Sequence, residues 1–177
     1  DRVTPSERIV QAAFDVLRGD VPNEPRAAGL CLALVRVVIE RAFYAGQWRF
    51  YDLHRTVIVN QAERFSQDPY ARDMEASLRD QGMALPLPRV PYGNDLSRYI
   101  DPSALDTVEP GTLIFRWDTA KDRNGVYIGH VGIVMPGRLV LENVANRYGA
   151  LQRGPTTLSR LGAWPVTTAI RFEPKTL

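Results

Sequence analysis

The sequence predicts an α+β domain in which helices come first and an antiparallel sheet follows. Apolar residues recur at helical spacing in the first half of the chain, whereas short β-branched runs separated by turn residues fill the last third. No glycine-rich phosphate loop precedes a helix, so a Rossmann-type fold is not expected. The 177 residues suit one domain, which at this length needs neither disulfides nor metals to hold its core.

The first expected helix has a clear beginning. Thr4 can cap it, Pro5 suits its first turn and Glu7 completes a capping box. Apolar residues then repeat at helical spacing until Gly19, which is expected to end the helix. Residues 20–29 form a polar linker to the next element.

A second helix is expected from about Leu30 to Ala45, with Gly46 at its end. The residues on its apolar face are Cys31, Val35, Val38 and Ala42. The residues assigned to its solvent side are Arg36, Glu40 and Arg41. Cys31 therefore lies near the start of this helix and shares its apolar face.

The middle of the chain is less regular. Residues 47–66 are ambiguous, and a third helix is expected to begin at Asp68-Pro69 and to end at Gly82. Residues 85–110 contain five prolines and are expected to form a long surface loop, whose length suggests a functional role.

The last third of the chain predicts four strands joined by short connections. Pro136-Gly137 marks the tightest turn, between the second strand and the third. The expected strands are Thr112–Trp117, Val126–Met135, Arg138–Val144 and Val166–Phe172.

Charge and composition exclude several classes of partner. A net charge of +2 over the whole chain gives no electrostatic reason to expect a nucleic acid partner. No apolar run approaches the ~20 residues that span a membrane, so no membrane partner is expected. The lone Cys31 excludes an intramolecular disulfide and a cysteine-rich metal site, and the calcium-like residues at 118–125 lack the right ligand spacing. We therefore expect no metal and no cofactor.

Cys31 is a candidate nucleophile, because a helix N-terminus favours the thiolate. Such a thiolate needs a base within hydrogen-bonding reach and a third group that orients the base. Of the two histidines, His54 lies in the ambiguous segment and is expected to be partly exposed. His130 is the better candidate, because Gly129 and Gly132 beside it leave room for another group in an apolar strand.

Two residues of the next strand could orient His130, namely Glu142 and Asn143. A two-residue turn at Pro136-Gly137 would place Asn143 opposite His130, whereas a three-residue loop is expected to place Glu142 there. Turn chemistry alone leaves both residues as candidates.

Three segments, in this order, resemble the NlpC-type and CHAP-type cysteine amidohydrolases. They are Leu30–Val35 (LCLALV), Glu109–Phe115 (EPGTLIF) and Gly129–Val134 (GHVGIV). The resemblance implies a papain-like fold in a single domain, residues 1–177, with N-terminal helices packed on an antiparallel sheet or half-barrel. It assigns residues 25–172 to the catalytic core and residues 1–24 to an N-terminal helix and linker.

The resemblance also implies an activity. Cys31 would be the nucleophile, His130 the general base and then acid, and Glu142, with Asn143 close behind, the orienting residue. The backbone N–H of Cys31 would help form an oxyanion hole. The implied substrate is a peptide or amide bond in a peptidoglycan stem peptide, and the implied setting is secreted, cell-wall-associated or phage-encoded.

Two alternatives stay open. The family has Asp before its cysteine and Ser-Gly after it, where this chain has Leu30 and Leu32-Ala33, and this difference favours a non-catalytic structural or phage-tail-associated protein. An acyltransferase or thioester hydrolase on the same scaffold is the other alternative, since a thiolate attacks any activated carbonyl. The sequence does not indicate an oligomeric state.

Overall fold

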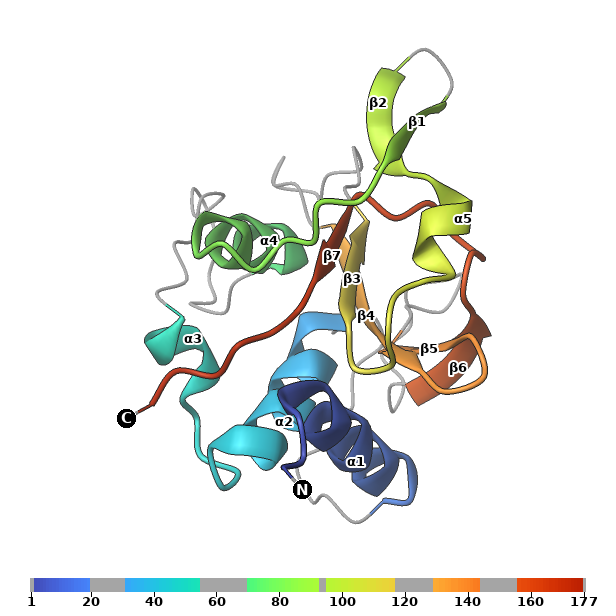
Figure 1. Ribbon diagram of the computed structural model, residues 1–177. Helices are drawn as coiled ribbons and strands as arrows, with labels where there is room; N and C mark the ends of the chain where they lie inside the picture. Colours follow the sequence, from blue (N-terminus) through green and yellow to red (C-terminus); the bar gives the residue numbers. More distant parts are fainter. Residues whose placement is uncertain are drawn as a thin grey trace, which may run out of the picture.

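A computed structural model describes residues 2–19, 31–54, 70–92, 95–116, 129–143 and 156–176. The longer helices gather on one side of a five-stranded antiparallel sheet, and a two-stranded hairpin projects from the rest of the molecule (Figure 1). The helices are α1 (Pro5–Leu17), α2 (Cys31–Phe43), α3 (Phe50–Leu53), α4 (Ala71–Asp80) and α5 (Pro102–Leu105). The strands are β1 (Arg89–Tyr92), β2 (Asp95–Ile100), β3 (Leu113–Arg116), β4 (His130–Met135), β5 (Leu139–Asn143), β6 (Thr156–Arg160) and β7 (Thr168–Ile170). The expected α+β class is confirmed.

The capping box predicted for α1 is present. The backbone N–H of Glu7 donates to Thr4 Oγ1 at 3.1 Å, and the N–H of Thr4 donates to Glu7 Oε2 at 3.3 Å. The first turn of α1 then rests on the turn that leads into β3. Gly111 in that turn has φ +96°, and a Cβ there would lie 2.3 Å from the carbonyl oxygen of Ser6, so only glycine fits.

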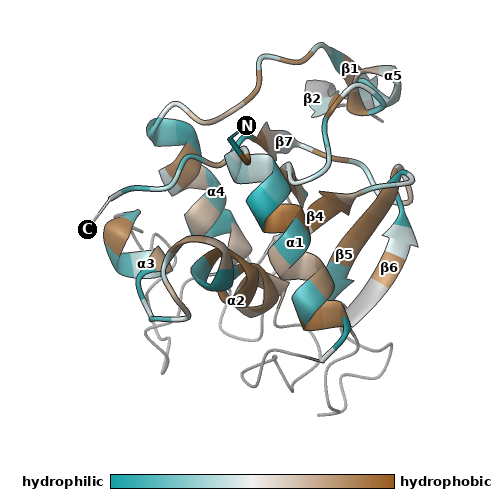
Figure 2. Ribbon diagram, turned by 60° about the horizontal axis from the view of Figure 1, so that its bottom comes forward, coloured by the Kyte–Doolittle hydropathy of each residue, from teal (hydrophilic) through white to brown (hydrophobic). Residues whose placement is uncertain are grey.

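Helix α2 is the central helix of the fold. It packs on α1, on α3 and on strands β4 and β5. Figure 2 shows α2 brown along much of its length, whereas α1 and α4 carry teal residues on their outer sides. The helix is therefore buried by its neighbours on several sides rather than along one stripe.

The assignment of Arg36 and Glu40 to the solvent side of this helix was wrong, because both are buried. Arg36 donates to Glu40 Oε1 at 2.5 Å, and its guanidinium lies 3.5 Å from the centre of the Trp48 ring. The other carboxylate oxygen of Glu40 accepts the backbone N–H groups of Arg49 and Phe50, at 2.8 and 3.1 Å. The segment after the helix thus folds back over this face and satisfies the buried charges.

The five strands lie in the order β6-β5-β4-β3-β7, so β4 is central. Alternate residues of the strands face opposite sides of the sheet. The side toward the helices carries Leu113, Phe115, Val131, Ile133, Leu141 and Ile170. The other side carries Ile114, Val134, Val140 and Ala169, which pack with Ile100, Leu105 and Val166.

The expected long loop over residues 85–110 was only partly right. Within it the chain forms the β1–β2 hairpin and the short helix α5. A proline is compatible with strand β1, because that strand belongs to a two-stranded ribbon in which each strand has an unpaired edge. The hairpin and α5 cover part of the second sheet face through Ile100 and Leu105.

Two other expectations concern α4 and membrane insertion. Helix α4 begins at Ala71 and ends at Asp80, while the proposed cap Asp68-Pro69 lies outside the described residues. Within the described part of the chain, no helix is both long and apolar enough to span a membrane.

His54 is a buried core residue, so the expectation of a partly exposed side chain was wrong. Its Nε2 lies 2.9 Å from the Tyr44 hydroxyl and its Nδ1 lies 3.3 Å from Gln81 Oε1. The ring centre of Phe172, in the C-terminal segment, is only 4.6 Å from that of His54. The histidine therefore joins the helical layer to the C-terminal segment.

We predict that acid destabilises the fold through His54. Burial lowers the pKa of His54 from 6.5 to about 4. Between these values the unfolded chain binds a proton that the folded chain does not, so stability falls as the pH falls through this window, by up to about 3 kcal/mol. Chemical denaturation at several pH values measures the free energy of unfolding. As the pH falls through this window, the free energy of unfolding of the wild type should fall by this amount relative to that of His54→Phe. A difference between the two proteins that does not change with pH would contradict the prediction.

Candidate active site

The structure brings together residues about a hundred positions apart in the chain. Cys31 is the first residue of α2, and His130 is the first residue of β4, on which α2 packs. Figure 1 shows the first turn of α2 lying against the sheet near β3 and β4. The Cys31 thiol lies close enough to the His130 ring to help raise the pKa of the imidazole.

The His130 ring interacts with both the Cys31 thiol and a carboxylate. Its Nε2 is 3.7 Å from Glu142 Oε2, an ion-pair distance somewhat longer than a hydrogen bond. This Nε2 is buried and makes no hydrogen bond within the described part of the chain.

Both neighbours favour a charged His130. Burial by itself lowers the pKa of His130, but the interactions with Cys31 and Glu142 outweigh burial and raise this pKa to about 9. Burial would likewise raise the pKa of Glu142, but His130 and Trp164 reverse the effect and lower it. The imidazole is thus positively charged at neutral pH and faces an ionised carboxylate.

Strand register decides which of the two candidates faces His130. Three residues, 136–138, separate the paired residues Met135 and Leu139, so the loop is the three-residue one. The expectation that this loop sets Glu142 directly opposite His130 was wrong, because the same register, continued, sets Glu142 opposite Gly132. The carboxylate reaches His130 diagonally, since residues two apart in a strand share a face.

Asn143 is placed differently. It is fully buried on β5, and strand alternation directs its side chain to the opposite face of the sheet from that of Glu142. The residue has an interaction of its own. Of the two candidates, Glu142 is the one at ion-pair distance from His130.

The two glycines beside His130 do make room, as their spacing suggested. A Cβ on Gly132 would lie 2.5 Å from Val140 Cγ1 and 3.1 Å from the carbonyl oxygen of Leu141, so a side chain there would collide with strand β5. Gly129 has φ +63°, and a Cβ there would lie 3.3 Å from the backbone nitrogen of Arg72 in α4. Each glycine therefore permits a close approach of a neighbouring element, α4 at Gly129 and β5 at Gly132.

Trp164 is a site residue that sequence reasoning missed. Its indole N–H donates to Glu142 Oε2 at 2.8 Å, and its ring meets the His130 ring edge to face, with centroids 5.2 Å apart. A hydrogen bond with Ser159 on β6 also helps to lower the pKa of Glu142. Nothing in the local sequence around Trp164 predicts this contact, which depends on how the chain returns after β6.

No protein-family model and no curated protein matches this chain. Within the described residues, no group of three or more His, Cys, Asp or Glu side chains could hold a metal ion. The calcium-like residues at 118–125 lie outside the described residues.

We predict that Glu142→Gln lowers the pKa of His130 from about 9 toward 6.5, because the variant removes a negative charge that favours the imidazolium. NMR titration of the two histidine rings would measure this shift, and His54 serves as an internal reference. The matched control is Glu173→Gln, which removes the same charge from an exposed position in the C-terminal segment. An unchanged His130 pKa in Glu142→Gln, or an equal shift in Glu173→Gln, would refute the assignment.

Proposed function

We propose that this chain is a cysteine hydrolase that cleaves a peptide or amide bond, with a papain-like arrangement of the NlpC/CHAP type. The observation that carries the proposal is that His130 interacts with both the Cys31 thiol and the Glu142 carboxylate, which together raise its pKa. This is the relation of nucleophile, base and orienting group that covalent catalysis by cysteine requires. The resemblance of three sequence segments to that family supports the same conclusion independently.

The chemistry follows from the order of these groups. The Cys31 thiolate attacks the carbonyl carbon of the scissile bond, and the backbone N–H of Cys31 helps to stabilise the oxyanion. The His130 imidazolium donates its proton to the leaving amine, which departs and leaves a thioester on Cys31. Neutral His130 then takes a proton from water, whose oxygen attacks the thioester, so that the acid product leaves and the thiolate–imidazolium pair is restored.

Glu142 and Trp164 act on this cycle through His130. The carboxylate favours the imidazolium and fixes the ring, while the indole N–H holds Glu142 Oε2 in place at 2.8 Å. Trp164 also covers one side of the His130 ring and so limits access of water to the ion pair. Both are positioning residues, because neither reaches the reacting bond.

The proposed substrate is a peptide, and specifically the stem peptide of bacterial peptidoglycan. This choice rests on the sequence resemblance. The mechanism needs no metal and no cofactor, because a thiolate and an imidazolium supply both the nucleophile and the acid. A secreted, cell-wall-associated or phage-encoded setting fits this substrate.

We predict that Cys31→Ala and His130→Ala each reduce hydrolysis on the order of a thousandfold or more, because each removes a reacting group. Mass spectrometry of peptidoglycan stem peptides incubated with the purified protein would detect the products. The matched control is His54→Phe, which alters the other histidine and should retain turnover at a pH where it stays folded. Undiminished cleavage by a folded Cys31→Ala protein would exclude the mechanism.

We also predict that iodoacetamide alkylates Cys31 near neutral pH faster than it alkylates free cysteine, because an imidazolium stabilises the thiolate. In His130→Phe, which keeps an aromatic ring but removes the charge, alkylation should slow by about tenfold or more. Intact-mass measurement over time gives both rates, and Cys31 is the only thiol in the chain. An unreactive thiol in the folded wild type would instead support the non-catalytic alternative.

A further inference from the structure

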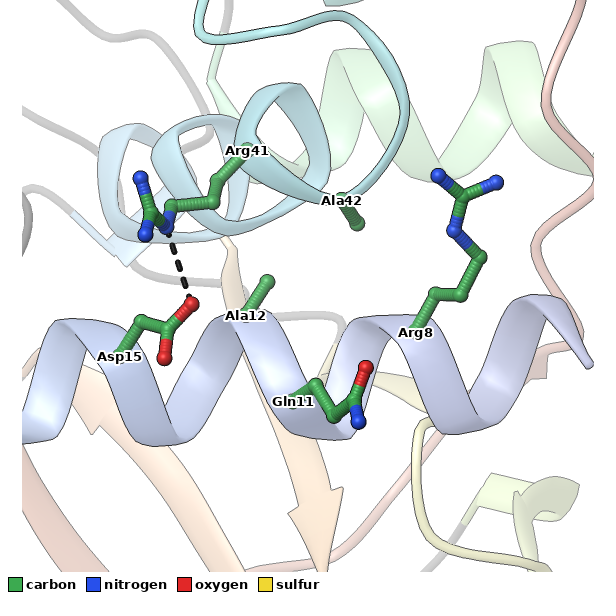
Figure 3. Close-up of a pocket in the computed structure, with 6 residues that line it drawn as sticks. All are labelled: Arg8, Gln11, Ala12, Asp15, Arg41 and Ala42. Atoms are coloured by element: carbon green, nitrogen blue, oxygen red, sulfur yellow. Dashed lines mark hydrogen bonds and ion pairs between the residues drawn. The ribbon is translucent and has the colours of Figure 1, made fainter. Parts of the chain in front are cut away.

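A surface pocket of about 230 Å³ lies between α1 and α2 (Figure 3). Ala12 of α1 and Ala42 of α2 face each other at its centre, and their small side chains leave the space between the helices. Arg8 and Arg41 stand at its two ends, with Gln11 and Asp15 also lining it. The pocket is distinct from the Cys31 site, since residues 31 and 41 of one helix are about 15 Å apart along its axis.

The lining of this pocket carries an excess of positive charge. Two guanidinium groups and one carboxylate give a formal charge of +1. Asp15 accepts from Arg41 Nε at 3.0 Å through one oxygen and from Arg18 through the other, so its charge is shared between two arginines. The carboxylate therefore neutralises only part of the cationic charge around the pocket.

Arg8 is the unbalanced cation. Among the described residues no carboxylate pairs with it, and its guanidinium lies over the Phe43 ring at 5.4 Å from the centroid. Arg41 uses its Nε on Asp15, and within the same described residues its two terminal amino groups have no other acceptor. Guanidinium groups bind carboxylate and phosphate oxygens with paired N–H donors, so both ends of the pocket offer donors suited to an anion.

We propose that this pocket binds an anionic group, a carboxylate or a phosphate, as a second site on the protein. Arg8 contacts the anion directly with the amide of Gln11 beside it, and Arg41 adds its terminal amino groups. The apolar floor at Ala12 and Ala42 accepts the uncharged part of the ligand. Such a group belongs either to an acidic peptide or to a phosphate-bearing molecule, and both present the same charged oxygens to the arginines.

Isothermal titration calorimetry at low ionic strength tests the site, because exposed charges are screened by salt. Tetraglutamate serves as the carboxylate probe and tripolyphosphate as the phosphate probe. The probe that binds more tightly shows whether the anionic group comes from an acidic peptide or from a phosphate-bearing molecule. Arg8→Gln should weaken binding by about tenfold, since one charge-assisted hydrogen-bonding partner is lost. Asp15→Asn should strengthen binding, because it raises the formal charge of the lining from +1 to +2.

Matched controls distinguish binding in the pocket from binding that depends only on the net charge of the protein. Arg138→Gln and Asp106→Asn make the same changes in net charge at an exposed ion pair on other elements, and they should leave both affinities unchanged. Circular dichroism confirms that each variant is folded, and Cys31→Ala should bind the probes as the wild type does, whether or not Cys31 is catalytic. The proposal is overturned if neither probe binds at millimolar concentration, or if Arg8→Gln and Arg138→Gln weaken binding equally.

Discussion

The packing of α2 across the central strand β4 is the constraint on which the rest of the structure depends. The helix is held by α1 on one side, by the sheet on another, and at its C-terminal end by backbone N–H groups that bind Glu40. Its first residue therefore has little freedom relative to β4, whose first residue is His130. Two side chains placed at the ends of two packed elements keep their relative geometry better than two carried on loops.

The two histidines show how placement in one fold gives the same residue type opposite properties. His54 sits among aromatic rings and neutral partners, so burial dominates and the ring stays neutral down to about pH 4. His130 is also largely buried, but it faces a thiol and a carboxylate, and its pKa rises to about 9. A raised histidine pKa stabilises the folded state below pH 6.5, and this contribution is lost as the pH rises toward 9.

Local patterns in the sequence predicted local structure well. The Thr4–Glu7 capping box, the glycine at the end of α2 and the two strands joined by the Pro136-Gly137 turn depend on neighbours a few residues away, which the sequence displays directly. Cys31, His130 and Glu142 could be singled out because helix position, flanking glycines and strand order are also visible in the sequence.

The features that escaped prediction depend on distant parts of the chain. Arg36 and Glu40 look like solvent residues on a helical wheel, and only the returning segment at Trp48–Phe50 buries and satisfies them. His54 is buried by Tyr44, Gln81 and Phe172, which three different segments supply. Trp164 joins the site for the same reason. Which residue of β5 contacts His130 depends on the β4–β5 register, and a shift of one residue in that register would change the answer.

The C-terminal segment has a consequence for the order of events during synthesis. The N–H of Arg171 donates to Met83 O, Phe172 packs against Phe43, Phe50 and His54, and the N–H of Lys175 donates to the Tyr44 hydroxyl. Residues of this segment thus complete a core begun by residues that leave the ribosome more than a hundred positions earlier. Until residue 175 has emerged, α3 and the end of α2 lack part of their apolar cover, so this layer cannot reach its final packing before then.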